Sequence, residues 1–179
     1  MKKLLTARHV KGALSRLQKA VLSQLPQDGR VAVVGIRTRG ETLAQRIVEH
    51  LRQTQPQLPI EHGVVDITFY RDDLSRRRGA PLVRATEIDF DLDDAWVLLV
   101  DDVLQTGRSI RAALDALHDF GRPKCVRLAV LIDRGGRELP ISADFIGQRV
   151  LVSPDEHVQV RLMENDGEEG VFSVKKRAN

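Results

Sequence analysis

A doubly wound, mainly parallel α/β sheet with helices on both faces is the fold that this sequence predicts. Three short apolar runs carry the prediction, at Val31–Ile36, Trp96–Val100 and Cys125–Ile132. Uninterrupted apolar runs of this length are typical of strands that are buried on both faces, as in parallel sheets. Segments with helical periodicity lie between them, and the alternation of strands and helices through residues 30–132 favours a doubly wound sheet.

The first elements follow from periodicity and from helix breakers. Apolar residues recur at helical spacing between residues 4 and 25, and Pro26 ends this predicted amphipathic helix. The first strand, Val31–Ile36, leads through R-T-R-G into a second predicted helix over Glu41–Gln53. The segment Ile60–Tyr70 is rich in β-branched residues and predicts another strand.

The second half continues the alternation. A strand at Trp96–Val100 is followed by a predicted helix over Ser109–Phe120, which Gly121 ends, and by a strand at Cys125–Ile132. Beyond Asp133 the pattern is short and irregular, with strand-like pieces near residues 144–146, 157–163 and 170–174. We expect one phosphate-binding domain over residues 1–179, with its core at 30–132, a lid at 70–87 and a small hood at 133–153 that the terminal segments complete.

Composition excludes several classes of protein. Hydrophobic residues make up 42% and charged residues 30%, with no low-complexity tract, which is typical of a soluble globular protein. No apolar run is long enough for a signal peptide or a bilayer span, and the single cysteine cannot form an internal disulfide, so we expect a cytoplasmic protein. The net charge of +3 is compatible with phosphate-bearing ligands or RNA but is a weak indication of nucleic acid.

The segment V-L-L-V-D-D-V-L-Q-T-G-R-S, residues 97–109, carries the chemistry. In parallel α/β sheets, ligands bind at the carboxyl ends of the strands, and Asp101 and Asp102 come at that point. The loop that follows leads directly into a helix, so backbone N–H groups and the helix dipole converge on one place. Thr106 and Ser109 can add hydroxyl donors, and Gly107 permits a tight turn. This arrangement suits a phosphate.

Two common phosphate loops are excluded. The sequence has no G-x-x-x-x-G-K-[ST] and no G-x-G-x-x-G after the first strand. Carboxylates beside a phosphate would repel it unless sugar hydroxyls or a hydrated Mg²⁺ lay between them. A phosphorylated ribose satisfies both groups, because the loop can hold the 5′-phosphate while Asp101 and Asp102 hold the 2′- and 3′-hydroxyls.

The segment at 97–109 resembles the signature of type I phosphoribosyltransferases, which bind phosphoribosyl pyrophosphate (PRPP). Together with V-G-I-R-T-R-G at 34–40, D-I-T-F-Y-R-D-D-L at 66–74, G-R-P at 121–123 and L-A-V-L-I-D-R-G-G-R-E-L-P-I-S-A-D-F-I-G at 128–147, it is similar to the PyrR family. Members of that family regulate attenuation of pyrimidine operons and act as uracil phosphoribosyltransferases. The resemblance implies a reaction in which uracil and PRPP give UMP and diphosphate, with Mg²⁺ bound to PRPP.

The resemblance also implies roles for individual residues. Asp101, Asp102, Arg39 and Arg71 form the implied catalytic set, with Mg²⁺ near Asp101 and Asp102 through PRPP. Tyr70, Arg71 and Asp72 begin the lid, and the hood contributes Asp133 and Val150 near the base. The implied PRPP-binding residues are Arg37, Thr38, Arg39, Gly40, Asp101, Asp102, Val103, Leu104, Gln105, Thr106, Gly107, Arg108 and Ser109.

RNA binding in the family is associated with a basic face on the N-terminal helix and the hood. Ser15, Arg16, Lys19 and Arg137 are the candidates for that role here, whereas the triple arginine at 76–78 is interpreted as the solvated edge of the lid. Three hood positions differ from the family pattern, where His, Arg and Lys are usual; they are Gly136, Ser142 and Gln148, and Lys19 itself stands where His is usual. Loss of cations weakens phosphate contacts, so RNA attenuation is less secure than the PRPP site.

Three interpretations therefore stay open. The first is an enzyme that makes UMP, and the second is an RNA-binding pyrimidine regulator that senses UMP or UTP and has vestigial catalysis. The third is a phosphoribosyltransferase for another base, because recognition of the base through backbone groups leaves little trace in a sequence. By resemblance we also expect a homodimer or a higher homo-oligomer and no membrane partner.

Overall fold

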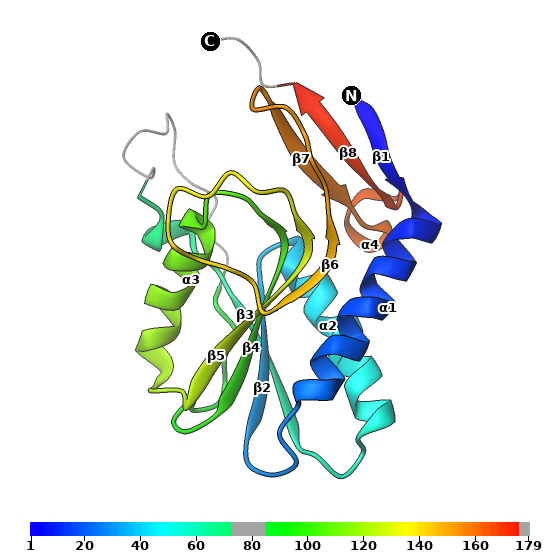
Figure 1. Cartoon of the computed structure of the whole chain (residues 1–179). Helices are drawn as coiled ribbons and strands as arrows, with labels where there is room; N and C mark the ends of the chain where they lie inside the picture. The colour runs from blue at the N-terminus through cyan, green and yellow to red at the C-terminus, as the bar shows by residue number, and fades with distance from the viewer. Residues whose placement is uncertain (73–84, 176–179) are drawn as a thin grey trace.

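The computed structural model describes residues 1–72 and 85–175, and its largest feature is a five-stranded parallel sheet (Figure 1). The strand order is β3-β2-β4-β5-β6, and every neighbouring pair runs parallel. The strands are β2 (Val31–Ile36), β3 (Ile60–Val65), β4 (Trp96–Leu104), β5 (Cys125–Asp133) and β6 (Phe145–Arg149). Since β4 lies at the centre, its carboxyl end is surrounded by the ends of its neighbours.

Helices cover both faces of this sheet, as the sequence predicts. Figure 1 shows α1 (Ala7–Gln24) and α2 (Arg39–Thr54) on one side and α3 (Arg108–Leu117) on the other. Alternate residues of β2 point to the two faces: Val33 packs in one apolar cluster with Leu43 of α2, and Val34 in a second with Ile110 of α3. The uninterrupted apolar runs are explained by these two cores. No helix in the described part of the chain has the length and apolar character needed to cross a membrane.

A second, antiparallel sheet joins the two ends of the described chain. Its order is β1 (Lys2–Thr6), β8 (Gly170–Lys175) and β7 (Glu156–Arg161), so β8 lies between the first strand and β7. The four-residue helix α4 (Met163–Asp166) connects β7 toward β8 and packs against α2. In Figure 1 this small sheet stands beyond the carboxyl ends of the parallel strands, beside the start of α1.

Several boundaries differ from those that periodicity predicts. The first helix begins at Ala7 because residues 2–6 pair with β8, and Thr6 with His9 forms a capping box at the helix start. The strand predicted over 60–70 ends at Val65: the carboxylate of Asp66 accepts the N–H of Thr68 at 2.7 Å, and the short helix η1 (Thr68–Tyr70) follows.

Two further boundaries lie near the carboxyl end of the sheet. β4 continues past Val100 to Leu104, because Val103 and Leu104 still pair with β5, so both aspartates belong to the strand itself. The helix predicted to reach Phe120 ends at Leu117 and continues as η3 (His118–Phe120). β6 lies inside the predicted hood segment, yet it pairs with β5 as the edge of the main sheet.

Candidate active site

The loop after β4 turns sharply at Gly107. This glycine has a φ of +90°, and α3 begins at the next residue, Arg108. The hydroxyl of Thr106 accepts the N–H of Arg108 at 3.3 Å, which stabilises the turn. The positive φ favours glycine, and a Cβ here would also make a tight contact, 3.3 Å from the Cβ of Ile141. The loop thus presents its backbone and the start of α3 at one place.

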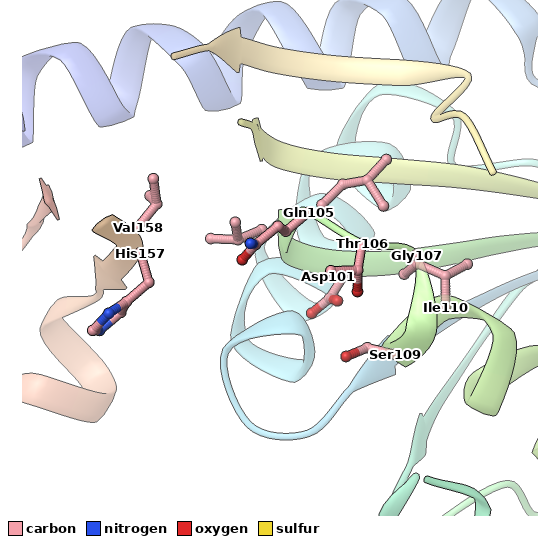
Figure 2. Close-up of a pocket in the computed structure, with 10 residues that line it drawn as sticks. Asp101, Gln105, Thr106, Gly107, Ser109, Ile110, His157 and Val158 are labelled. Atoms are coloured by element: carbon pink, nitrogen blue, oxygen red, sulfur yellow. The ribbon is translucent and has the colours of Figure 1, made fainter. Parts of the chain in front are cut away.

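A cavity of about 300 Å³ opens beside this loop. Figure 2 shows Asp101, Thr106 and Ser109 on one side of it and His157 and Val158 of β7 on the other. The two sides come from different sheets and are more than 45 residues apart in sequence. The full lining is Asp101, Val103, Leu104, Gln105, Thr106, Gly107, Ser109, Ile110, His157 and Val158.

His157 and Val158 were missed by the sequence reasoning. The sequence predicts their strand. Its position beside the loop after β4 depends on pairing with β8, and the sequence around residues 157 and 158 does not indicate that position. Of the hood residues named from the resemblance, Asp133 and Val150 do not belong to the lining of this cavity. The N–H of Val150 instead donates to the carbonyl of Asp133 at 3.0 Å.

Of the two aspartates at the end of β4, Asp101 is buried and Asp102 is partly buried, and the two interact with each other. Asp101 is 8% exposed, and its carboxylate accepts the N–H of Asp102 at 2.9 Å. Burial raises the pKa of Asp101 well above its usual range, and the charge of Asp102 raises it further. Burial also raises the pKa of Asp102, while the guanidinium of Arg39 acts in the opposite direction. Such a pair favours hydroxyl donors or a cation close by.

The loop after β2 leads into the first residue of α2, Arg39, which brings a cation to the same end of the sheet. Arg39 forms a two-pronged ion pair with Asp166 of α4, Nη2 to Oδ1 at 2.6 Å and Nε to Oδ2 at 3.1 Å. The ion pair lowers the pKa of Asp166 and raises the pKa of Arg39. Arg39 therefore lies between two carboxylates: its charge acts to lower the pKa of Asp102, and its guanidinium is already paired with Asp166.

The rest of that loop is fixed by close packing. The peptide bond between Arg37 and Thr38 is cis. Arg37 is engaged by two carboxylates, Glu87 at 2.5 Å and Glu41 at 3.3 Å. A Cβ on Gly40 would lie 2.5 Å from the carbonyl oxygen of Val100 in β4, so only glycine allows α2 to approach the strand that carries the aspartates.

The start of the predicted lid lies beside the loop after β4. Arg71 and Asp72 line a second cavity of about 140 Å³ together with Thr106, Arg108 and Ser109. Arg108 bridges Asp72 at 2.5 Å and Glu138 at 2.7 Å, and the hydroxyl of Tyr70 donates to Asp119. Residues 73–84 of the lid, with Arg76, Arg77 and Arg78, lie outside the described residues.

Three of the four RNA candidates lie together on α1. Ser15, Arg16 and Lys19 are exposed, and Arg16 donates to the side chain of Gln148 in β6 at 2.8 Å. The fourth candidate is placed differently. Arg137 is turned inward, with its side chain 25% exposed and hydrogen-bonded to the phosphate loop.

Within residues 1–72 and 85–175, no group of three or more His, Cys, Asp or Glu side chains is arranged to hold a metal ion. The neighbouring carboxyls of Asp101 and Asp102 fit a hydrated Mg²⁺ whose other ligands come from a bound substrate, since Mg²⁺ in such sites keeps waters and binds through one or two carboxylates.

Comparison with known sequences gives matches over nearly the whole chain. The family model described as phosphoribosyl transferase domain matches residues 2–164. The bifunctional protein PyrR of Roseiflexus sp. (strain RS-1) is 51% identical, with 99% of this chain and 97% of that protein covered. The bifunctional protein PyrR of Deinococcus radiodurans is 44% identical, with 92% and 89% covered.

Solved structures with the same fold include two purine enzymes. A hypoxanthine phosphoribosyltransferase from Trypanosoma cruzi in a ternary substrates complex has a TM-score of 0.71 at 16% identity, with 97% of this chain and 95% of that one covered. A hypoxanthine-guanine phosphoribosyltransferase from Bacillus anthracis has a TM-score of 0.69 at 14% identity, with 97% and 98% covered. At this identity the likeness concerns the fold alone, and it confirms the predicted fold class.

Proposed function

This chain belongs to the phosphoribosyltransferase family, and within it to the PyrR proteins, and from that premise we propose that it converts uracil and PRPP to UMP and diphosphate. One observation carries the proposal. A single cavity is lined by a strand-loop-helix phosphate cradle, a buried aspartate and a wall from β7. A nucleoside monophosphate needs these three surfaces, one for its phosphate, one for its ribose and one for its base.

The reaction exchanges one bond at the anomeric carbon of the ribose. The bond from this carbon to the diphosphate oxygen breaks, a bond to a ring nitrogen of uracil forms, and that nitrogen loses its proton. Positive charge builds on the ribose and negative charge on the leaving diphosphate. Asp101 and Asp102 would hold the ribose hydroxyls near the positive centre, while Arg39 would meet the diphosphate.

PRPP binding extends across both loops in this proposal. The segment 103–109 takes the 5′-phosphate, residues 37–40 take the diphosphate, and Arg71 closes over them from the start of the lid. Asp101 and Asp102 would hold Mg²⁺ that arrives with PRPP, and this ion neutralises charge on the diphosphate. Asp133 and Val150 stay proposed contributors on the base side, next to His157 and Val158.

An assay with four different bases tests the proposed enzyme activity directly. Diphosphate release from PRPP and Mg²⁺ is measured with uracil, orotate, hypoxanthine and adenine offered in turn, and a reaction without base measures hydrolysis. We expect turnover above the hydrolysis rate with uracil alone. Turnover with a different base would replace uracil in the proposal, and no turnover with any base despite UMP binding would favour a nucleotide-sensing regulator.

We propose a second role in RNA binding, because the relatives at 44–51% identity are named bifunctional proteins. Ser15, Arg16 and Lys19 form an exposed polar face on α1 that could contact RNA phosphates. Compared with the family pattern, Ser142 and Gln148 replace cations and Gly136 replaces an aromatic donor, which weakens the proposed RNA contacts.

We expect filter retention of the organism's pyrimidine-operon leader RNA to increase when UMP or UTP is added. The same RNA with its bases shuffled is the control, because contacts to phosphate alone would retain both. Equal retention with and without the nucleotides would remove the regulatory role. In the same proposal the protein acts in the cytoplasm as a homodimer or a higher homo-oligomer.

A further inference from the structure

Arg137 is the side chain whose surroundings differ most from what its sequence position suggests. Its Nε donates to the carbonyl of Ile141 at 2.9 Å, and its Nη1 donates to the carbonyls of Gln105 at 3.0 Å and Leu104 at 3.3 Å. Its Nη2 lies 2.8 Å from the carboxylate of Asp133. All three guanidinium nitrogens are thus engaged, and two of the four partners belong to the phosphate loop.

Arg137 is part of a segment that holds this loop from behind. The bracing segment, residues 134–144, supplies the N–H of Arg134 to the carbonyl of Leu104, and the N–H groups of Glu138 and Leu139 to the carbonyl of Thr106. Three consecutive carbonyls of the loop, at residues 104, 105 and 106, therefore accept hydrogen bonds from the bracing segment. None of the bracing residues belongs to the lining of the cavity.

Capture of these carbonyls orients the loop. In a trans peptide, the C=O and the N–H of the next residue point in opposite directions. When the carbonyls of residues 104–106 face the bracing segment, the N–H groups of Gln105, Thr106 and Gly107 face the other way, toward the cavity that these three residues line. Arg137 is the only bracing partner of the Gln105 carbonyl among the described residues.

We propose that Arg137 is a positioning residue for the 5′-phosphate: it holds the loop carbonyls outward, so that the loop N–H groups stay aimed at the phosphate. Through Asp133 and Ile141 it also joins the loop to the end of β5 and to the chain before β6. The inference deepens the proposed function and rests on it only for PRPP itself. A phosphate on any ribose tests the same loop.

The test measures two ligands that use different ends of the site. Calorimetric dissociation constants are obtained for ribose 5-phosphate and for pyrophosphate with wild type, Arg137→Ala and Arg137→Lys. We expect Arg137→Ala to weaken ribose 5-phosphate about tenfold or more, because misplaced donors lose charge-assisted contacts, while pyrophosphate changes less than about twofold. The affinity of Arg137→Lys for ribose 5-phosphate should lie between those of wild type and Arg137→Ala, because one ammonium replaces a guanidinium that reaches four acceptors.

Arg149→Ala is the matched control. This substitution removes the same charge from the same region as Arg137→Ala. The side chain of Arg149 is 78% exposed and lies 4.0 Å from the carboxylate of Asp133, and within the described residues it makes no contact with the loop. It should bind both ligands as wild type does. If Arg137→Ala is unfolded, Arg137→Lys decides: selective weakening of ribose 5-phosphate supports the proposal.

Two outcomes would overturn the inference. The first is an unchanged ribose 5-phosphate affinity in the Arg137 variants, and the second is equal weakening of both ligands, which indicates a general structural role. Failure of the proposed function has a different signature. Wild type would then turn over no base with PRPP, although selective loss of ribose 5-phosphate binding in the variants would still support the positioning role of Arg137.

Discussion

Asp102→Asn should lower kcat/KM for PRPP about a hundredfold or more while the fold remains intact. A carboxylate accepts hydrogen bonds from two ribose hydroxyls and faces the developing positive charge, whereas the amide of Asn is neutral and turns donors toward the hydroxyls. Steady-state diphosphate release with uracil measures the effect. Near-normal turnover by Asp102→Asn would contradict the ribose assignment.

The same substitution should leave the free energy of unfolding at neutral pH unchanged or higher. The pKa values of Asp101 and Asp102 are raised in the folded protein, so folding disfavours their charged forms. A raised carboxyl pKa means that stability falls as the pH rises from about 3.9, the unfolded value, through the folded pKa. Asn removes this cost. Asp28→Asn, at an exposed site far along the chain, is the control and should change neither turnover nor stability.

Gly40→Ala should lower both stability and PRPP turnover. The added Cβ would lie 2.5 Å from the carbonyl oxygen of Val100 and 3.2 Å from the Cα of Asp101, and both neighbours are backbone of the central strand. Overpacking of this kind typically costs about 1–3 kcal/mol. Because the clash separates the start of α2, which carries Arg39, from the aspartates, we expect turnover to fall about tenfold or more at a temperature where the variant is folded. Thermal unfolding and diphosphate release provide the two measurements.

Gly12→Ala gives a matched control for this prediction. Gly12 is also a helical glycine, but a Cβ there would meet only the flexible end of Arg16, at 3.6 Å. Alanine is favoured over glycine in a helix by up to about 1 kcal/mol, so this variant should be as stable as wild type or more stable, with unchanged turnover. If Gly40→Ala behaved in the same way, the close approach of α2 to β4 would not be what fixes the loop.

The parallel sheet could be predicted from sequence because its signal is local. Each of β2, β4 and β5 is an apolar run, and burial on both faces requires such a run wherever the strand sits. Boundaries were harder, since they depend on single contacts. The carboxylate of Asp66 ends β3 at a point where β-branched residues still favour a strand, and residues 2–6 become a strand only because β8 is beside them.

The candidate site divides in the same way. Asp101, Asp102 and Gly107 lie within seven residues of one another, so their relation to a phosphate could be inferred from a single segment. The role of Arg137 could not, because its contacts with Leu104 and Gln105 span 33 and 32 residues and form only when the bracing segment folds over the loop. His157 is even further along the sequence from the loop after β4, on a strand of the second sheet.

The small sheet is completed later in the synthesis of the chain than the parallel sheet, and this order separates the two sides of the proposed substrate site in time. Its central strand, β8, is the last described element, and both β1 and β7 pair with it. While the chain is being translated, residues 2–6 have no strand partner until residues 170–175 emerge, and β7, which carries His157, emerges only shortly before this partner strand. The sheet that holds the phosphate loop is assembled from residues 31–149, all of which emerge earlier. In the proposed function, a nascent chain would therefore form the loop that takes the phosphate before it completes the strand on the base side of the cavity.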